Sequence, residues 1–259
     1  MNFCICYHSK DEAAITILQE LKKLDTGIPI YEFSEKEHLI FLDDIDQKVN
    51  EDFIIFISKH QAKESSKTLT VHSIGNFGKA IYGGSERKLC PSSSFVNKIL
   101  YKELVKNASG SKYQCTLEAT HHGPYIRKGS CFIELGSTTK EWNDSIGGEI
   151  IANTLDFFCR NFKYQDTKLF IPAVGIGAGH YCPSFTKLKK DSPYAISHVL
   201  PNYHMPFTEG MILELLNNSL ETNSRILIDW KGVGNAEERD HLIKILEKLN
   251  LPYIKTSEV

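Results

Sequence analysis

The sequence has no long hydrophobic run. No apolar stretch in it approaches the roughly 20 residues that a membrane-spanning helix requires. The opening residues, MNFCICYHSK, also lack the basic segment followed by an apolar stretch that is typical of a secretory signal. We therefore expect a protein of the cytoplasm that has no contact with a membrane.

A marked excess of one charge is also missing. The chain has 30 basic and 32 acidic residues, with a formal net charge of −2. This balance does not imply a global electrostatic attraction to nucleic acid, although a local basic face remains compatible with it. The seven cysteines contain no CxxC pair and are odd in number. Reduced thiols in a cytosolic protein are the simplest interpretation.

The 259 residues are enough for one large core. We find no internal repeat, no low-complexity segment and no obvious linker. We therefore expect a single domain over 1–259, with an elaborated loop region near 60–95. Nothing in the sequence indicates an obligate protein partner, and we expect a monomer.

Hydrophobic periodicity predicts alternating strands and helices. The opening β-α-β order favours an α/β layered fold around a mixed, mainly parallel sheet. The runs at 113–120 and 130–135 are expected to be neighbouring strands because a short loop joins them. Predicted strands cover 2–7, 28–33, 38–42, 52–58, 69–73, 113–120, 130–135, 168–177, 194–200 and 225–230, with an edge strand at the C-terminus. Predicted helices cover 11–24, 94–107, 139–162, 208–219 and 235–249, the last beginning with a capping box of Asn235 and Glu238.

The histidines follow or interrupt these predicted strands. Ligands of parallel α/β sheets bind beyond the carboxyl ends of the strands, on loops that a rigid scaffold supports. Imidazole also titrates near neutral pH without perturbation. Six of the ten histidines are placed in this way: His60, His72, His121, His122, His180 and His198.

The segment 56–78 combines hydroxyl, amide and imidazole side chains. One interpretation is a pocket for a polar substrate, and the other is a hydroxyl-rich surface loop. Composition alone favours the surface loop slightly. The polar residues are Ser58, His60, Ser65, Ser66, Thr70, His72 and Asn76.

The motif EATHHGPY (118–125) places two histidines at the turn after a strand. Both rings could face one cavity as metal ligands or acid–base groups, or one could be exposed and the other buried. Glu134 interrupts the apolar run FIEL, and a buried carboxylate needs a partner. We expect the His121–His122 pair to be that partner, unless Glu134 faces solvent on an edge strand.

Glycines dominate the segment VGIGAGHYCP (174–183), and they allow a ligand to approach the backbone closely. The match to a dinucleotide fingerprint is poor, because no long helix follows. His180 at the tip is the better indication of a site. His198, inside the run AISHVL, is by itself more typical of a satisfied core histidine.

Five segments together resemble the archaeal and plant type of D-aminoacyl-tRNA deacylase. They occur in the family's order and extend over nearly the whole chain. Any one alone would be a weak signal, whereas the linked set is strong. The segments are TLTVHSIGNFG (68–78), EATHHGPY (118–125), FIELGSTTKEW (132–142), GAGHYCP (177–183) and AISHVLPNY (195–203).

The resemblance implies a fold like that of purine nucleoside phosphorylases and peptidyl-tRNA hydrolases. It also implies hydrolysis of the ester between a D-amino acid and the 3′ adenosine of tRNA, and an association with Zn²⁺. The candidate zinc ligands are His121, His122, Glu134 and His180, and the candidate catalytic residues are His122, His180 and His121. Substrate-binding candidates are Ser58, His60, Thr70, His72, Asn76, Thr120, Gly177, Gly179, Tyr181 and His198.

The hypothesis has two mechanistic forms. Zinc would lower the pKa of a bound water to about 7; without it, His122 or His180 would act as general base. Backbone N–H groups near 177–179 are candidate oxyanion donors.

Two departures from the family pattern concern tRNA contacts. Ala178 replaces a glycine, and Ser184 stands where the family has an arginine. Nearby cations that could replace the arginine are Lys187, Lys189 and Lys190. A stripe of Lys98, Lys102 and Lys106 is either a further phosphate contact or a solvated helix face.

Two other functions compete with the deacylase hypothesis. The first is a zinc-dependent amidase or peptidase of the same broad fold that acts on a small acylated molecule. The second is a non-catalytic RNA-binding protein, against which the low net charge and the absence of an aromatic-rich RNA module argue.

Overall fold

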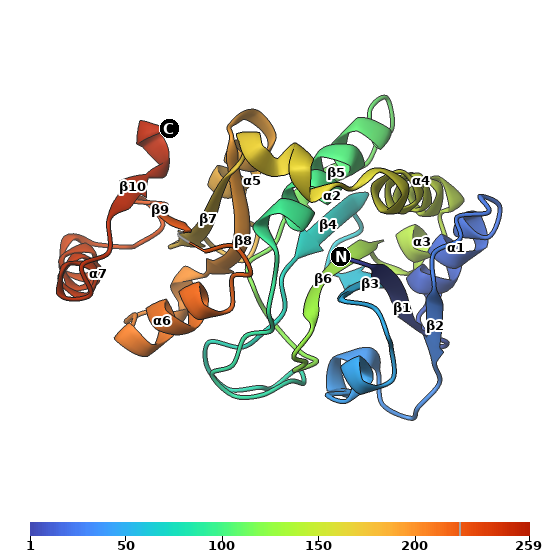
Figure 1. Cartoon of the computed structure of the whole chain (residues 1–259), viewed down its shortest axis with the longest axis horizontal. Helices are drawn as coiled ribbons and strands as arrows, with labels where there is room; N and C mark the ends of the chain where they lie inside the picture. Colours follow the sequence, from blue (N-terminus) through green and yellow to red (C-terminus); the bar gives the residue numbers. More distant parts are fainter. Residues whose placement is uncertain (223) are drawn as a thin grey trace.

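The computed structural model describes residues 1–222 and 224–259, with the backbone alone for 164–166. Its strands form two sheets that lie side by side (Figure 1). The six-stranded sheet has the order β2-β1-β3-β6-β4-β5 and the four-stranded sheet the order β10-β9-β7-β8. The strands are β1 Phe3–His8, β2 Ile30–Phe33, β3 Phe53–Gln61, β4 Thr68–His72, β5 Gln114–Leu117, β6 Gly129–Ser137, β7 Ile171–Ile176, β8 Tyr194–Leu200, β9 Arg225–Ile228 and β10 Tyr253–Lys255.

Neighbouring strands run parallel except for β4 and β6. The expected layered α/β fold around a mixed, mainly parallel sheet is confirmed. The division into two sheets was not predicted, because periodicity assigns residues to faces but does not say which strands pair. The helix α2 (Ser94–Asn107) contacts strands of both sheets. One hydrophobic core also includes residues of both sheets, such as Ile133 and Ile196. A single domain over 1–259 stays a prediction.

The helices begin where capping residues predict them. Asp11, Ser93, Thr208 and Asn235 each accept a hydrogen bond from a backbone N–H of the first turn, and Glu238 completes the predicted capping box. The α-helices are α1 Glu12–Leu21, α2 Ser94–Asn107, α3 Thr139–Trp142, α4 Ser145–Asn161, α5 Pro183–Asp191, α6 Glu209–Asn217 and α7 Ala236–Lys248. Both α2 and α5 contact strands of the two sheets. Short 3₁₀ helices are η1 Leu39–Phe41, η2 Ile45–Gln47, η3 Tyr164–Leu169, η4 Asn202–His204 and η5 Thr256–Glu258.

Three local predictions are wrong. Within 38–42, Leu39–Phe41 form the 3₁₀ helix η1 instead of a strand, with Leu39 buried and Phe41 exposed. The predicted helix 139–162 is two helices, since Asp144 caps the second one, α4. The strands β5 and β6 are not neighbours, because β4 lies between them.

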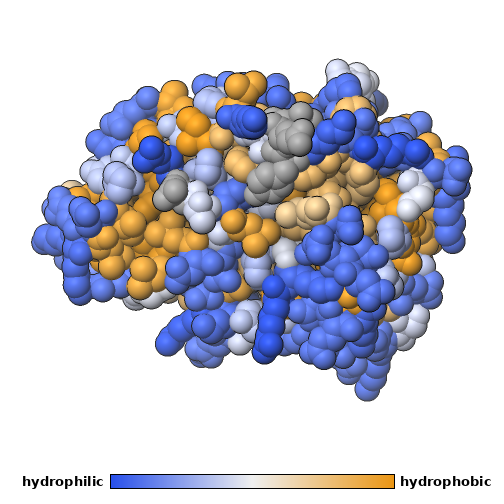
Figure 2. All heavy atoms as spheres, in the orientation of Figure 1, coloured by the Kyte–Doolittle hydropathy of each residue, from blue (hydrophilic) through white to orange (hydrophobic). Residues whose placement is uncertain are grey.

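The surface carries both hydrophilic and hydrophobic side chains. Most of the face in Figure 2 is hydrophilic, and hydrophobic side chains gather mainly beside the four-stranded sheet. Among the described residues, no helix has both the length and the apolar character needed to cross a bilayer. Residues 73–93 contain neither a helix nor a named strand.

Candidate functional site

The site lies on one face of the six-stranded sheet. Alternation along each strand sends every second side chain to the same face, and the register aligns these side chains across β3, β6 and β4. Ser58, Glu134 and Thr70 form one row. The next positions along these strands on the same face place His60 opposite Gly136 and His72 opposite Phe132. We expected a crevice beyond the carboxyl ends of the strands. The site instead lies on the face of the sheet, where the antiparallel strand β4 pairs with β6.

The opposite face of the same strands is apolar. Ile57, Ile133 and Val71 belong to the buried core there, which includes residues of α1, α2 and α4. The acidic residue inside the apolar run FIEL is thus explained by alternation: Ile133 and Leu135 enter the core, whereas Glu134 enters the polar face.

Glu134 is buried and has polar neighbours. Its Oε2 lies 3.7 Å from Nε2 of His72 and 3.8 Å from Nδ1 of His60. Thr70 donates a long hydrogen bond of 3.5 Å to the same oxygen. The predicted partner, the His121–His122 pair, is wrong, because those rings belong to a segment that crosses above the sheet face.

That crossing segment, 118–123, is fixed by backbone contacts. The amide of Ala119 donates to the carbonyl of His180, and Ile74 and His121 form an isolated bridge. Glu118 thereby enters the polar face fully buried. Its Oε1 lies 2.9 Å from Nδ1 of His60, and its Oε2 lies 3.3 Å from Nε2 of His180 and 3.4 Å from Nε2 of His121.

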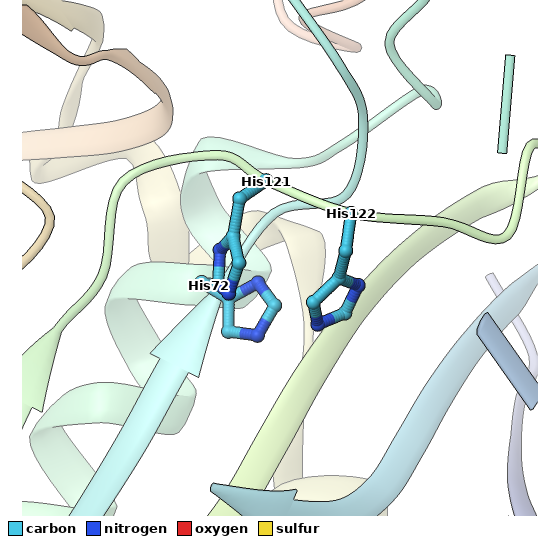
Figure 3. A group of neighbouring side chains, drawn as sticks. All are labelled: His72, His121 and His122. Atoms are coloured by element: carbon cyan, nitrogen blue, oxygen red, sulfur yellow. The ribbon is translucent and has the colours of Figure 1, made fainter. Parts of the chain in front are cut away.

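Three imidazoles meet at the end of β4. Figure 3 shows the rings of His72, His121 and His122 turned toward one another, the first from the strand and the other two from the crossing segment. Ring centroids are 4.2 Å apart for His72 and His121, and 4.4 Å apart for His121 and His122. His122 has a positive φ of 43°, a conformation uncommon for a residue with a side chain.

Each of these rings has its Nδ1 against a backbone carbonyl. The acceptors are the carbonyls of Ser73 at 3.1 Å, Ala119 at 2.8 Å and Gly123 at 2.6 Å. Carbonyl oxygens only accept, so each neutral ring carries its proton on Nδ1 and has a lone pair on Nε2. Metal-binding histidines are held by the same kind of outer hydrogen bond.

The donor atoms fit a metal ion. His72, His121 and His122 offer ligand atoms within 4.8 Å of one another, as do Glu118 with His121 and His180, and Glu118 with His60 and Glu134. Nε2 of His72 and both oxygens of Glu118 are buried, and among the described residues no group completes a well-aligned hydrogen bond to them. Buried polar atoms without partners are costly, and a bound cation would satisfy them.

The protonation equilibria divide the histidines into two groups. Burial and the charge of His72 lower the pKa of His121 well below its ordinary value, and burial lowers the pKa of His122 to about 3. Burial opposes protonation of His60 and His72 as well, but Glu118 and Glu134, respectively, raise their pKa values. Burial would raise the pKa of Glu118, yet His180 and His60 hold it well below the usual range. His121 and His122 are therefore neutral at neutral pH, beside an ionised carboxylate.

A cavity of about 750 Å³ opens above the cluster. It has the size of pockets that enclose small molecules. Of the predicted site residues, six line it: Ser58, His60, His121, His122, Glu134 and His180. The remaining lining residues are His38, Ile40, Lys59, Gln61, Ala62, Lys63, Tyr82 and Glu118.

A buried carboxylate, Asp11, fixes the wall of the cavity. Its Oδ2 accepts hydrogen bonds from Ser58 Oγ at 2.7 Å and from the amide of Lys59 at 3.1 Å, and it lies 3.0 Å from Nε2 of His38. The same residue caps α1 through Ala14. One carboxylate thus connects the first helix, strand β3 and the segment that carries Ile40.

Several predicted substrate-binding residues lie outside the cavity. His198 is fully buried, with its nitrogens 3.2 Å from Thr120 Oγ1 and 3.2 Å from the carbonyl of Asn218. Asn76 donates to the carbonyl of Gly83 and so holds the loop that carries Tyr82. Gly177 donates its own N–H to the carbonyl of Leu200, so this group is not available to an oxyanion, and neither Gly177 nor Gly179 lines the cavity.

The structure also changes what was expected of the lysines proposed as phosphate contacts. Lys98 is buried and donates to the carbonyls of Lys189 and Ser192, so the stripe with Lys102 and Lys106 is not a basic surface. Lys189 is buried as well, and burial lowers its pKa to about 7. The helical spacing was correct, but of the three lysines only Lys102 and Lys106 face solvent.

Sequence reasoning missed Glu118, whose carboxylate lies within 3.4 Å of three histidines. The signal was available, because Glu118 precedes the two histidines in a motif that was already singled out. Asp11 was missed as well, because its role as a helix cap is enough to account for an aspartate at this position. Its second role, as a hydrogen-bond partner of His38 and Ser58, depends on where these residues lie in the folded protein.

Comparisons with known proteins agree on one family. A family model described as D-aminoacyl-tRNA deacylase matches residues 47–254. Curated proteins named D-aminoacyl-tRNA deacylase are similar over most of their length. The protein from Pyrococcus abyssi is 34% identical, covering 95% of this chain and 96% of its own. That from Thermococcus onnurineus is 32% identical, covering 92% and 90%.

A solved structure shares the fold. The crystal structure of a conserved protein of unknown function superposes with a TM-score of 0.88 at 28% identity, and covers 100% of this chain and 96% of its own. The family model and the relatives extend over the strands and the crossing segment that build the histidine cluster. The chain belongs to the D-aminoacyl-tRNA deacylase family.

Proposed function

We propose that this chain hydrolyses the ester bond of D-aminoacyl-tRNA and releases the free D-amino acid and tRNA. The enzyme would act in translation quality control in the cytoplasm, where aminoacyl-tRNA is used. The single observation that carries the proposal is the buried Glu118–histidine cluster at the base of a cavity of about 750 Å³, in a member of this family. A pocket of this size suits an aminoacyl-adenosine end. An amidase or peptidase finds no support in the comparisons.

Zinc suits the histidine trio best. His72, His121 and His122 would hold it through Nε2, because their Nδ1 atoms are occupied, and three protein ligands are typical of catalytic zinc. The bound ion would supply Lewis acidity and a lower pKa for water in the cavity. This set retains two of the four ligands expected from the sequence, replaces Glu134 and His180 with His72, and leaves those two residues free for other roles.

His180 is placed to move protons. Its side chain is 38% exposed at the cavity, and its Nε2 lies 3.3 Å from the Glu118 carboxylate. The carboxylate would orient the ring, as in other base–carboxylate pairs. His180 would take a proton from water as the water oxygen bonds to the ester carbonyl carbon. The same ring would return the proton to the departing ribose oxygen as the acyl–oxygen bond breaks.

Tyr181 is placed to stabilise the oxyanion. Glu118 raises the pKa of His60 against burial, which shifts the ring toward the form with protons on both nitrogens. Nε2 of His60 lies 2.9 Å from the Tyr181 hydroxyl and would then donate to it. The hydroxyl proton of Tyr181 is thereby free to point at a substrate oxygen, which is the requirement for an oxyanion donor.

The test compares three substrates with the purified chain: D-Tyr-tRNA, L-Tyr-tRNA and an N-acyl-D-amino acid. We expect release of D-tyrosine from the first, much slower release from the second, and no turnover of the third. Preferential cleavage of the N-acyl amino acid would favour the amidase hypothesis, and absence of D-Tyr-tRNA cleavage by metal-replete protein would overturn the proposal.

A further inference from the structure

A second hollow lies beside the histidine cavity. It has a volume of about 840 Å³ and lies between the connection that joins β3 to β4 and the helix α5. Its lining is polar and rich in hydroxyl groups. The hydroxyl-bearing residues are Ser65, Ser66, Thr68, Thr116, Tyr181 and Thr186.

The two hollows share part of a wall. Ala62 and Lys63 line both. Tyr181 lines the second hollow, while its hydroxyl lies 2.9 Å from His60 in the first. Tyr181 is 44% exposed, so its ring presents an accessible aromatic surface at the junction. A chain-like ligand could therefore extend from one hollow to the other across this tyrosine.

The second hollow carries uncompensated positive charge. Lys63, Lys187 and Lys190 line it and are exposed. No ion pair within the described part of the chain involves any of the three, whereas Lys67 on the same connection is paired with Asp144. Two acids, Glu64 and Asp191, also line the hollow. The local excess of one positive charge contrasts with the net charge of −2 for the whole chain.

This combination matches a single-stranded nucleic acid. Lysines neutralise phosphates, hydroxyls donate to phosphate and sugar oxygens, and aromatic rings stack on bases. We propose that this groove binds the sugar–phosphate backbone of the unpaired nucleotides that precede the terminal adenosine, with Tyr181 at the point where the strand turns into the histidine cavity. The inference rests on the proposed function and assigns the path by which its substrate arrives.

Lys187 and Lys190 are the residues to test, because they line the groove but not the histidine cavity. The double variant K187Q/K190Q is compared with wild type and with K244Q, a matched exposed lysine on α7. Two substrates are used: D-Tyr-tRNA and 3′-O-D-tyrosyl-adenosine, which lacks phosphates.

For the double variant we expect KM for D-Tyr-tRNA to rise about 10-fold at moderate salt. The plot of log KM against log salt should become shallower by about 1.4, since each contact to a single strand contributes about 0.7. Hydrolysis of the adenosine ester should not change, and K244Q should match wild type on both substrates.

An unchanged KM and salt slope for tRNA, with wild type active, would overturn the groove and leave the deacylase function intact. Equal losses on both substrates would also overturn it, because the lysines would then act on the cavity. If wild type cleaved neither substrate, the proposed function itself would fail, which is a distinguishable result.

Discussion

The carboxylate of Glu118 lies 2.9 Å from Nδ1 of His60, and both side chains are almost completely buried. The same carboxylate reaches His180 and His121 through its other oxygen. One buried negative charge thus faces three imidazoles from three different segments of the chain, and it raises the pKa of His60 against burial.

Glu118→Gln should therefore reduce kcat for D-Tyr-tRNA by about 100-fold or more, the range for an impaired acid–base group. The physical reason is that loss of the charge removes both the orientation of His180 and the raised pKa of His60. Steady-state kinetics over a pH series would measure it. Glu149→Gln, at an exposed position of α4, is the control, and a kcat within about threefold of wild type for Glu118→Gln would contradict the assignment.

Metal content provides a readout independent of activity. Protein purified without chelators should contain about one equivalent of zinc, and His72→Asn should contain far less, because three-ligand sites tolerate few losses. Elemental analysis measures both. His204→Asn, which alters a histidine outside the cavity lining, should keep its zinc. Wild type with less than about 0.2 equivalents, or full occupancy in His72→Asn, would argue against the trio as the ligand set.

His198 predicts a pH dependence of stability. Burial lowers its pKa from 6.5 to about 4 in the folded protein. Above pH 6.5 the ring is neutral in both states; below it the unfolded chain takes up a proton that the folded protein refuses. Stability is therefore lost as pH falls from 6.5 toward 4, by about 1.4 kcal/mol per pH unit for this group.

The measurement is urea unfolding of wild type and His198→Asn at several pH values. The variant should be less stable at pH 7, because buried hydrogen bonds are lost, but its free energy of unfolding should fall less steeply below pH 6.5. Parallel curves for the two proteins would show that His198 is not the titrating group.

The sequence allowed most strands and helix starts to be predicted, because alternation and capping are local properties. Ser58, His60 and Glu134 could be selected from such patterns. Their juxtaposition could not, since it depends on β4 inserting antiparallel beside β6, a pairing between segments about 64 residues apart, as for Thr70 and Glu134. Local patterns carry no information on that pairing.

His198 and Glu118 show the same limit of sequence-based prediction, the first as a structural residue and the second as a candidate functional residue. Both belong to motifs of the family resemblance, and both are buried. His198 bonds to Thr120 and to a backbone carbonyl, so it is satisfied inside the core. Among the described residues, no group completes a well-aligned hydrogen bond to Glu118, which faces the histidines. Only the spatial partners separate a structural residue from a functional one.

The most direct test of the central claim is the single-turnover rate of D-tyrosine release from D-Tyr-tRNA by wild type and His122→Ala. The histidine trio on the polar sheet face is held responsible for ester cleavage, so the rate should fall by about 100-fold or more while circular dichroism stays unchanged. A folded His122→Ala protein that releases D-tyrosine at the wild-type rate would contradict the account.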